Sequence, residues 1–331
     1  MSRTLFKKRR IYRDALRSFF FERGFEEVET PVLVPAPGQE PYLDPFHTRL
    51  DDGKSGQDRY LITSPEYYHK RLLAAGYEKI FEIARVFRNG SSETKGLHHV
   101  EFTMVEWYRA YASYLEIMED LENLIYFLAQ TGGSPNAEKL KPPFPRISMS
   151  DAFRQYAGVD LKPFLKNDPN FALAENKAGF CGITEADELP VRFFKIFITK
   201  VEPNLGTSNP VFLLDFPSSQ ASLSKVREDD PDLCERFELY IHGVELANGF
   251  TELNDPVEQQ NRFEKEAKER AARGGCPVPQ DPAFLEALEL GMPPSGGVAL
   301  GLDRLLMVLM GEQELSAVLP FRHIHSQSEK E

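Results

Sequence analysis

Two carboxylates and an amide in one short stretch, residues 237–253, have the residue types of a divalent-cation site. Glu245 and Glu252 flank Asn248, and all three side chains offer the hard oxygen donors that Mg²⁺ prefers when it also holds phosphates. Apolar and polar residues alternate on both sides of His242-Gly243, which predicts two strands joined by a two-residue turn. The second strand would carry all three candidate ligands.

The spacing of the two glutamates restricts this hypothesis. Glu245 and Glu252 are seven positions apart, and a flat strand sends residues at an odd spacing to opposite faces. We therefore predict a bulge or a sharp bend at Asn248-Gly249, where the glycine permits one. The stretch taken alone is equally compatible with two surface glutamates on an edge hairpin.

The composition of the chain restricts the class of protein to which it can belong. The 331 residues, 41% hydrophobic and 27% charged, suffice for one large domain or two smaller ones. No apolar run has the length of a membrane span, and no signal-peptide core follows the charged start. Three widely separated cysteines favour a reducing cytoplasm over a disulfide framework. The net charge of −12 disfavours broad, non-specific binding of nucleic acid.

Periodicity predicts the elements that would position these residues. Helices are expected at residues 6–23, 66–73, 115–130, 255–273, 282–290 and 303–310. Strands are expected at residues 25–33, 59–63, 79–87, 101–108 and 211–216, besides the hairpin. Pro31 lies inside the first strand and cannot donate to a ladder, so that strand is expected at an edge or an interface. We further expect a linker at 131–145, a helical insertion at 146–209 and a disordered tail at 323–331. Runs of strands with helices at their ends indicate an α+β fold.

Three stretches, in this order, resemble the signature motifs of class II aminoacyl-tRNA synthetases. Residues 23–31 (RGFEEVETP) resemble motif 1, Arg88 with His98 and Glu101-Phe102 resembles motif 2, and residues 296–304 (GGVALGLDR) resemble motif 3. Their order, with the paired carboxylates before the last motif, sets the surface-hairpin alternative aside. The resemblance implies one α+β catalytic domain over residues 1–331, built on a mixed, mainly antiparallel sheet flanked by helices.

A more specific resemblance is to the elongation factor P–(R)-β-lysine ligase family, which comprises paralogues of the lysyl-tRNA synthetase catalytic domain. It covers nearly the whole chain and rests on five segments, TSPEY (63–67), EFTMVEWY (101–108), VEPNLG (201–206), SQASL (219–223) and ELANGF (245–250). It implies activation of (R)-β-lysine, or lysine, by ATP as an aminoacyl-adenylate, and transfer of the aminoacyl group to a lysine side chain of elongation factor P. We expect no anticodon-binding OB-fold, because motif 1 lies close to the start of the chain. Motif 1 of this class forms a two-fold interface, so we also expect a homodimer.

The resemblance also implies roles for individual residues. Adenylation joins two anions, so catalysis depends on positioning and on charge neutralisation. Arg88 is assigned to the α-phosphate and the substrate carboxylate, and Arg304 to ATP through stacking and a γ-phosphate contact. Glu245 and Glu252 are assigned to Mg²⁺, with Asn248 as a third ligand or orienting group. The remaining residues expected around ATP are Asn89, Gly90, His99, Leu246 and Gly301.

The amine-binding pocket is expected to use side chains that accept hydrogen bonds, because a buried ammonium without a partner is costly. The matching positions are Ser64, Pro65, Glu66, Tyr108 and Glu252. Glu66 also follows a proline at a helix start, where an acid that complements the helix dipole is ordinary. Ala299 stands where lysyl-tRNA synthetases usually carry glycine, and with Ser64 it is expected to reshape the pocket toward β-lysine.

The segment that resembles motif 2 departs from the family pattern. It reads Arg88-Asn89-Gly90 where the family has Arg-Asn-Glu, Glu93 is displaced, and His99 replaces an asparagine assigned to ATP. The contacts to adenine are therefore the least determined part of the site. The sequence does not decide between β-lysine and α-lysine, and it identifies neither the acceptor lysine nor its general base.

Two other functions remain open. One is a minimal aminoacyl-tRNA synthetase, or a small-molecule AMP-forming amide ligase, on the same fold. The other is a catalytically silent binding paralogue. Silent paralogues usually lose the motif arginines or the metal carboxylates, whereas Arg88, Arg304, Glu245 and Glu252 are all present here.

Overall fold

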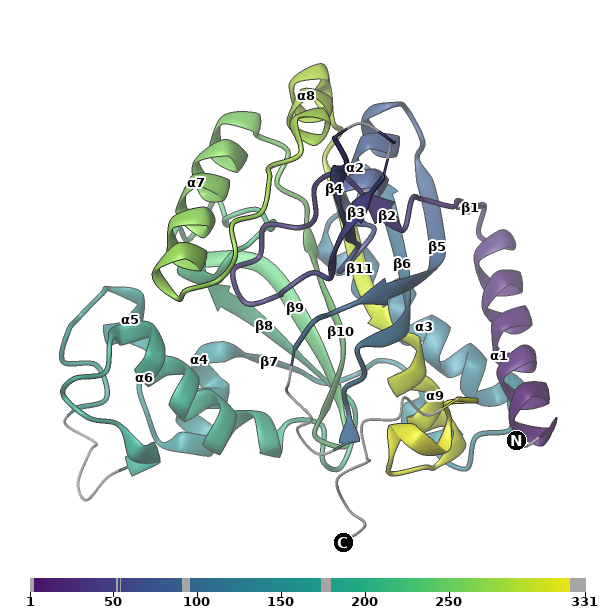
Figure 1. Ribbon diagram of the computed structural model, residues 1–331. Coiled ribbons are helices and arrows are strands. Elements are labelled where there is room, and N and C mark those ends of the chain that lie inside the picture. The colour runs from purple at the N-terminus through teal and green to yellow at the C-terminus, as the bar shows by residue number, and fades with distance from the viewer. Residues whose placement is uncertain (1–2, 52, 54, 91–95, 174–179, 322–331) are drawn as a thin grey trace, which may run out of the picture.

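The computed structural model describes residues 3–51, 53, 55–90, 96–173 and 180–321. Its centre is one large sheet in which antiparallel pairs predominate, with parallel pairs at the two edges, β1–β5 and β7–β8 (Figure 1). Across the sheet, the described strands lie in the order β1 (Glu26–Glu27), β5 (Lys79–Phe87), β6 (Glu101–Ala110), β11 (Ser295–Gly301), β10 (Val244–Thr251), β9 (Leu233–Ile241), β8 (Val211–Pro217) and β7 (Arg146–Ser148). This is the α+β class expected from the sequence.

Helices cover both faces of this sheet. The described helices are α1 (Arg3–Phe21), α2 (Glu66–Ala74), α3 (Tyr114–Thr131), α4 (Met149–Ala152), α5 (Lys162–Leu165), α6 (Leu189–Ile196), α7 (Pro256–Ala272), α8 (Pro282–Gly291) and α9 (Leu302–Met310). Helices α1, α3 and α9 pack on one face and form the main core with the sheet residues that point toward them. Helices α2, α7 and α8 pack on the other face. In the described part of the chain, no helix is both long enough and apolar enough to cross a membrane.

The main core is rich in aromatic rings. Phe20 of α1 stacks on Phe81 of β5 with ring centroids 4.5 Å apart, and the Trp107 ring of β6 lies 5.3 Å away. All three side chains are fully buried. Burying a large apolar side chain stabilises a fold by roughly 1.5–3 kcal/mol, so this contact holds α1 firmly against the sheet.

Most elements lie close to their predicted positions. The predicted strand 79–87 matches β5 residue for residue. The other elements predicted outside residues 25–33 and 146–209 have ends within three residues of those observed, except that the first strand of the hairpin begins four residues earlier than predicted, at Leu233. Ser113 explains the sharp start of α3, because its hydroxyl accepts from the amide of Leu115 while Glu116 accepts from the amide of Ser113. Two short strands, β3 (His47–Leu50) and β7, were not predicted.

The single strand predicted at residues 25–33 is wrong. The segment divides into β1 at the edge of the large sheet and β2 (Leu33–Val34), which belongs to a smaller sheet with β4 (Gln57–Leu61) and β3. Pro31 lies between β1 and β2, in neither strand, because its nitrogen has no hydrogen to donate. The amide and hydroxyl of Thr30 instead donate to the carboxylate of Glu82 on β5. The expected edge position is confirmed for β1.

Residues 146–209, predicted as a helical insertion, contain the short helices α4, α5 and α6 and begin with β7, which pairs in parallel with β8. They form a second core of their own around Phe153, Phe164 and Phe193, to which Leu213 of β8 and Tyr240 of β9 contribute. The insertion therefore packs directly on one end of the large sheet. The predicted tail, residues 323–331, lies outside the described residues.

Candidate functional site

One face of the large sheet gathers polar side chains from neighbouring strands. Residues paired directly across antiparallel strands share a face, and Ala299 of β11 pairs with Glu106 of β6 and with Asn248 of β10. Glu82 of β5 pairs with Glu106, and Glu238 of β9 pairs with Asn248. The five residues therefore lie across the floor of one site, on the face that α2, α7 and α8 flank.

The predicted hairpin is confirmed. Its turn residues, His242 and Gly243, have φ angles of 55° and 73°, the left-handed conformation that a two-residue turn of this kind requires. The predicted bulge also exists, but its position was wrong. The register between β9 and β10 shifts between Glu245 and Ala247, which makes Leu246 the extra residue. Asn248-Gly249 is paired regularly.

Gly249 is required for close packing of neighbouring strands and not for the bulge. A Cβ atom there would lie 2.6 Å from the ring of Phe237 and 2.7 Å from the carbonyl oxygen of Gly297. The residue thus permits close packing of three neighbouring strands, and the strand does not bend there. Glycine alone is therefore an ambiguous signal, because close approach and bulging both require it.

The bulge brings Glu245 and Glu252 to the same face of the sheet, as the prediction required. Leu246 and Ala247 are consecutive, yet both are buried in the main core, so alternation is interrupted once. Glu245 pairs with Tyr240 and Asn248 pairs with Glu238, and these partners are two positions apart on β9. Glu245 and Asn248 therefore share the polar face, and Glu252, four positions beyond Asn248, follows on that side. The extra residue thus allows Glu245 and Glu252, although seven positions apart, to lie on one face of the strand.

A buried lysine links two of the candidate residues. Lys70 of α2 is fully buried, and its Nζ lies 2.7 Å from Oε1 of Glu66 and 2.6 Å from Oε2 of Glu252. The Lys70 ammonium also lies 5.3 Å from the centroid of the Phe250 ring, within cation–π range. The second oxygen of Glu252, Oε1, is buried and has no hydrogen-bond partner among the described residues. Glu66 and Glu252, predicted to bind a substrate amine, are thus brought together around a cation.

Glu106 is the centre of the adjoining network. Its Oε1 accepts from the hydroxyl of Ser64 at 2.7 Å, and its Oε2 accepts from the hydroxyl of Tyr108 at 3.0 Å. The His69 ring lies between two carboxylates, with Nε2 at 2.9 Å from Glu82 and Nδ1 at 3.7 Å from Glu106. Burial lowers the pKa of His69, but hydrogen bonds to Glu106 and Glu82 outweigh it and raise that pKa overall. Ser64 and Tyr108, both predicted pocket residues, are held by one carboxylate.

The electrostatics of this cluster favour an added cation. Burial raises the pKa of Glu66 to about 7 and that of Glu252 to about 8, against the opposing effect of Lys70. Burial lowers the pKa of Lys70, but its two glutamates outweigh that effect and raise it. Glu66 and Glu252 thus share one ammonium, and the nearby charge of Glu106 raises the pKa of both. A second ammonium placed among them would stabilise the ionised form of the glutamates, which burial disfavours.

Arg88, at the end of β5, is a half-buried cation that suits an anionic ligand. Its backbone amide donates to Val100, and its guanidinium lies over the ring of Phe102 at 5.2 Å. Its Nε is buried without a hydrogen-bond partner, and the guanidinium makes no ion pair with a described residue. Burial lowers the pKa of Arg88, although the nearby Glu245 acts to raise it. A planar cation with unused donors suits a phosphate or carboxylate ligand.

Arg304 is held differently. It follows Gly301, where β11 ends and α9 begins, and donates from Nη1 to the carbonyl of Glu245 at 2.7 Å, beside the bulge. It also donates to the carbonyl of Leu97 and, from Nη2, to Nε2 of His98, at 3.2 and 2.9 Å. Arg304 therefore joins motif 3 to the end of the motif 2 segment. Its neighbour Asp303 turns to the other face, where it pairs with Arg9 at 2.8 Å.

The other predicted ATP residues lie around these two arginines. The amide of Asn89 donates to the carbonyl of Asp44, Gly90 is exposed and His99 is half-buried. Gly301 lies close to the bulge, since a Cβ there would be 3.6 Å from the carbonyl oxygen of Leu246. Glu93 lies outside the described residues. Pro65 occupies the N-cap position of α2 without a side-chain hydrogen bond, and Ala299 packs against the buried cluster that includes Met104.

The three predicted metal ligands have different surroundings. The Glu245 carboxylate is 39% exposed and makes only a long ion pair, 3.8 Å, with Arg304, so it is accessible to a cation. Asn248 accepts from Arg236 at 3.1 Å, and Glu252 faces Lys70. Among the described residues, no three His, Cys, Asp or Glu side chains are arranged to hold a metal. The donors fit Mg²⁺ held chiefly by phosphates with one protein carboxylate, which is a common way for proteins to bind it. The metal role of all three stays a prediction.

Several residues of the site were not predicted. Lys70 lies four positions after Glu66 on α2, the spacing at which helix side chains meet, so its ion pair could have been found from the sequence. Glu106 lies two positions before Tyr108 on β6 and therefore shares its face. Glu238, whose pKa is raised to about 7 by burial and by the charge of Glu245, gave no comparable signal. Its place depends on the register between β9 and β10.

Comparison with known protein families agrees with this geometry. The family described as tRNA synthetases class II (D, K and N) matches residues 1–325, which is nearly the whole chain. ATP-dependent activation of an amino acid as an aminoacyl-adenylate is the chemistry that this family implies. The chain belongs to the class II tRNA synthetase (D, K and N) family.

Proposed function

We propose that this protein activates a lysine-like amino acid, (R)-β-lysine or lysine, with ATP and Mg²⁺, and passes the aminoacyl group to a lysine side chain of elongation factor P. Family membership supports the adenylation step. The recipient is proposed from the residues 63–67, 101–108 and 245–250, which resemble the elongation factor P ligases. A homodimer formed through the region of motif 1 is part of the same proposal.

The observation that carries the choice of amino acid is the acidic cluster on α2, β6 and β10. Two carboxylates, those of Glu66 and Glu252, share the single ammonium of Lys70, Glu106 lies close enough to raise the pKa of both, and one oxygen of Glu252 has no partner among the described residues. An aliphatic ammonium of the substrate would supply the missing charge and hydrogen-bond donors. An amino acid with an uncharged side chain would leave these acceptors unpaired, at a cost of several kcal/mol.

Arg88 and Arg304 would have different roles in the reaction. The substrate carboxylate attacks the α-phosphorus, the bond to pyrophosphate breaks, and the negative charge that accumulates is spread over the phosphate oxygens. Arg88, with its unused donors, would hold the attacking carboxylate and the α-phosphate together. Arg304 would bind the outer phosphates or stack on adenine, with its fork kept in place by Glu245 and Leu97. Mg²⁺ would neutralise phosphate charge, and Glu245 is the exposed carboxylate suited to hold it.

Transfer requires a neutral amine on the acceptor. The acceptor lysine nitrogen attacks the carbonyl carbon of the adenylate, an amide bond forms, and AMP leaves with the electrons of the broken carbon–oxygen bond. A lysine with a pKa near ~10.4 is mostly protonated at neutral pH, so a proton must first be removed. The carboxylate of Glu238, with a pKa raised to about 7, is suited to accept such a proton.

The test is amino-acid-dependent exchange of labelled pyrophosphate into ATP, followed by mass measurement of elongation factor P. We expect exchange with (R)-β-lysine or lysine and a mass increase of one aminoacyl group on elongation factor P. Arg88→Gln should reduce exchange by at least about a hundredfold. Arg154→Gln is the matched control, because that arginine is 66% exposed on the insertion.

Three outcomes would contradict parts of the proposal. Charging of tRNA without modification of elongation factor P would identify a minimal aminoacyl-tRNA synthetase. Modification of a small amine instead would identify an amide ligase. Absence of exchange with every amino acid tested, in protein that binds ATP, would identify a silent paralogue.

A further inference from the structure

His69 of α2 is a fully buried histidine that the proposed reaction does not use. Buried polar atoms are normally hydrogen-bonded, but in His69 only one ring nitrogen is. Its Nε2 lies 2.9 Å from Oε2 of Glu82, while its Nδ1 has no hydrogen-bond partner among the described residues. Nδ1 faces Oε2 of Glu106 at 3.7 Å, which is too long for a hydrogen bond but within ion-pair range. The imidazole therefore lies between two carboxylates.

Glu82 and Glu106 need a shared cation. They pair directly across β5 and β6, and like charges in that position destabilise a sheet. Both are buried, with exposed fractions of 6% and 0%. In the described part of the chain, neither carboxylate forms an ion pair with any residue except His69. Lys70, the neighbouring buried cation of α2, pairs with two other glutamates. Among the described side chains, His69 is thus the one placed to neutralise this pair.

The surroundings of the ring favour its charged form. A neutral imidazole has one nitrogen that accepts hydrogen bonds, and that nitrogen would face a carboxylate oxygen, which also accepts. Protonation of both nitrogens makes both contacts attractive. The phenol of Tyr108, with its ring centroid 5.1 Å away, stays uncharged because burial raises its pKa. On α2 itself, Glu66 and Lys70 pair with each other. Burial lowers the pKa of His69, yet the two carboxylates raise it overall, in agreement with the charged form.

Glu106 transmits the effect of His69 to the amine pocket. Its two oxygens accept from the hydroxyls of Ser64 and Tyr108 at 2.7 and 3.0 Å, so this carboxylate sets the position of two predicted pocket side chains. If Glu82 repelled it without compensation, Glu106 would move away or take up a proton, and either change would disturb both hydrogen bonds. An attraction between charges weakens only gradually with distance, unlike a hydrogen bond. The 3.7 Å contact therefore restrains Glu106 and still allows it to adjust to a substrate ammonium.

The other side of the imidazole is anchored. The amide of Thr30 donates to Oε1 of Glu82 at 3.1 Å, and the hydroxyl of Thr30 donates to Oε2 at 2.9 Å. Because the carboxylate is fixed by two donors, the ring of His69 cannot rotate without losing its hydrogen bond to that carboxylate. His69 is thus held in place from the motif 1 segment, on the side away from Glu106.

We propose that His69 is a positioning residue of the amino-acid pocket: as an imidazolium between two glutamates, it keeps the Glu106 carboxylate ionised and in place around the substrate ammonium. The proposal rests on the proposed function for the chemistry of that ligand. His69 acts on the ligand only through Glu106. Loss of its charge should therefore weaken binding of the amino acid and leave binding of ATP nearly unchanged.

His69→Gln tests this role in pyrophosphate exchange. The amide can still donate to Glu82 but carries no charge. We expect the KM for the amino acid to rise at least about tenfold, with the KM for ATP and kcat within about threefold of the wild type. His47→Gln is the matched control, because His47 also pairs with a carboxylate, that of Asp58, but is 52% exposed on β3. Equal rises in both KM values, or no change in either, would overturn the proposal.

Removing the charge that His69 balances should partly rescue the variant. In His69→Gln/Glu82→Gln, nothing repels Glu106 across the strands, so the melting temperature should recover and the KM for the amino acid should fall back toward the wild-type value. A double variant whose KM for the amino acid is no lower than that of His69→Gln would show that charge is not what His69 supplies, and would overturn the proposal.

Nuclear magnetic resonance of protein labelled with nitrogen-15 histidine reads the charge of the ring and needs no catalysis. The signal of His69 is the one missing from His69→Gln. Both ring nitrogens should be protonated at about pH 7.5, where an ordinary histidine, with a pKa near ~6.5, is mostly neutral. A neutral ring at that pH would overturn the proposal, even with normal pyrophosphate exchange.

Failure of the proposed function gives a different result. Wild-type protein with a charged His69 but no pyrophosphate exchange would contradict the proposed function alone. The Kd for lysine, measured by calorimetry, then takes the place of the KM, and it should rise in His69→Gln and not in His47→Gln. Absence of lysine binding in the wild type would overturn both proposals.

Discussion

Glu66, Lys70 and Glu252 show how burial can set the chemistry of single residues. Each would be ordinary at a surface, but all three are held in a water-excluded cluster where two carboxylates share one ammonium. Their ordinary values would leave both acids ionised at neutral pH, whereas burial raises both pKa values. Ligand binding there must therefore be coupled to proton release.

The pKa of Glu66, raised to about 7, predicts a pH dependence for substrate binding. Below that pH Glu66 is protonated and offers a substrate ammonium less charge, so the Kd should increase by up to about tenfold per pH unit as the pH falls. Glu252, with a pKa raised to about 8, extends this dependence, so the Kd should level off only when both carboxylates are ionised. Calorimetric titration with lysine between about pH 6 and about pH 8 measures this.

Glu66→Gln provides the comparison for that experiment. The amide cannot ionise, so binding should be weaker at all pH values and the pH dependence should flatten. Glu258→Gln is a suitable control, because that glutamate is 47% exposed on α7. The same slope in Glu66→Gln and wild type would show that another group controls binding.

Two glycines of β11 should respond oppositely to the same substitution. A Cβ at Gly297 would overlap the ring of Tyr108 and Oε1 of Glu252, whereas a Cβ at Gly301 meets nothing closer than 3.6 Å. Gly297→Ala should therefore destabilise the fold by about 1–3 kcal/mol and disrupt the amine pocket. Gly301→Ala should preserve the melting temperature and weaken ATP binding. Thermal unfolding and ATP titration of both variants test this pair, and unchanged ATP binding in Gly301→Ala would argue against a nucleotide near that residue.

At the scale of elements, the insertion is fastened to the sheet through the β9–β10 turn. The amide of His242 donates to the carbonyl of Gly206 at 2.7 Å, and that of Gly243 donates to Leu205 at 3.1 Å. Gly206 can approach so closely because it lacks a side chain, since a Cβ there would overlap the carbonyl of Tyr240. The hairpin that carries Glu245 is thereby supported from outside the site.

Gly206 and Gly158 form a matched pair for testing this contact. Both have a φ of 67°, but a Cβ at Gly158 meets open space. Gly158→Ala should cost only the left-handed strain, about 1–2 kcal/mol, while Gly206→Ala should cost at least about 3 kcal/mol. Denaturant unfolding of the two variants gives the difference, and equal losses would show that the turn and the insertion do not need this close approach.

The sequence predicted the long elements well because their patterns are local. Periodicity and the cap at Ser113 define α3, and alternation defines β5. The position of the bulge was wrong because an extra residue in a strand depends on packing across the strand, and both Leu246 and Ala247 look like ordinary core residues. The short β3 and β7 depend on partners far away in the chain, so local patterns do not reveal them.

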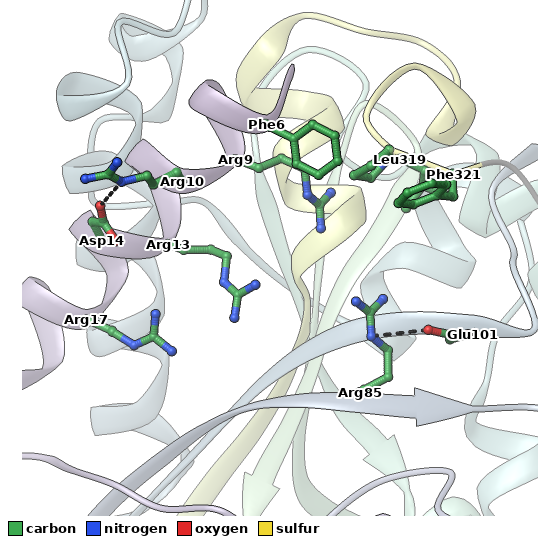
Figure 2. Close-up of a pocket in the computed structure, with 11 residues that line it drawn as sticks. Phe6, Arg9, Arg10, Arg13, Asp14, Arg17, Arg85, Glu101, Leu319 and Phe321 are labelled. Carbon is green, nitrogen blue, oxygen red and sulfur yellow. Dashed lines mark hydrogen bonds and ion pairs between the residues drawn. The ribbon is translucent and has the colours of Figure 1, made fainter. Parts of the chain in front are cut away.

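The same distinction applies to the site. The roles of Arg88 and Arg304 stay predictions that rest on their resemblance to the family motifs. The odd spacing of the glutamates correctly required a bulge. The contacts of Glu106 and Glu238 could not be derived, because their neighbours are set by register between strands. The cavity that Arg9, Arg13 and Arg85 line between α1 and β5 (Figure 2) was not predicted, because it joins α1 to β5 and to residues near the end of the described chain.

At the scale of the whole molecule, the two cores are physically joined. Tyr240 and Leu213 belong to sheet strands, yet they pack within the core of the insertion. Phe193 is central to that second core, with rings of Phe153 and Phe164 stacked at 4.9 and 4.7 Å. The insertion should therefore unfold together with the sheet.

Phe193→Ala tests this coupling. Removal of the buried ring should lower the free energy of unfolding by about 3–5 kcal/mol. A single thermal transition at a lower temperature is expected by both calorimetry and circular dichroism. Two separate transitions, of which only the first is shifted, would instead show that the insertion is an independent domain.

The extra residue at Leu246 makes the length of this strand as important as its composition. Deleting Leu246 would leave Glu245, Asn248 and Glu252 on one face by simple alternation, and the hairpin would become more regular. It would also move the carbonyl of Glu245, to which Arg304 donates, and shorten the strand between the two ends of the site. Point substitutions here change one contact, whereas a one-residue deletion changes the distance between the phosphate end and the amine end. Evolution of this strand should therefore tolerate exchanges of residue type more readily than changes in length.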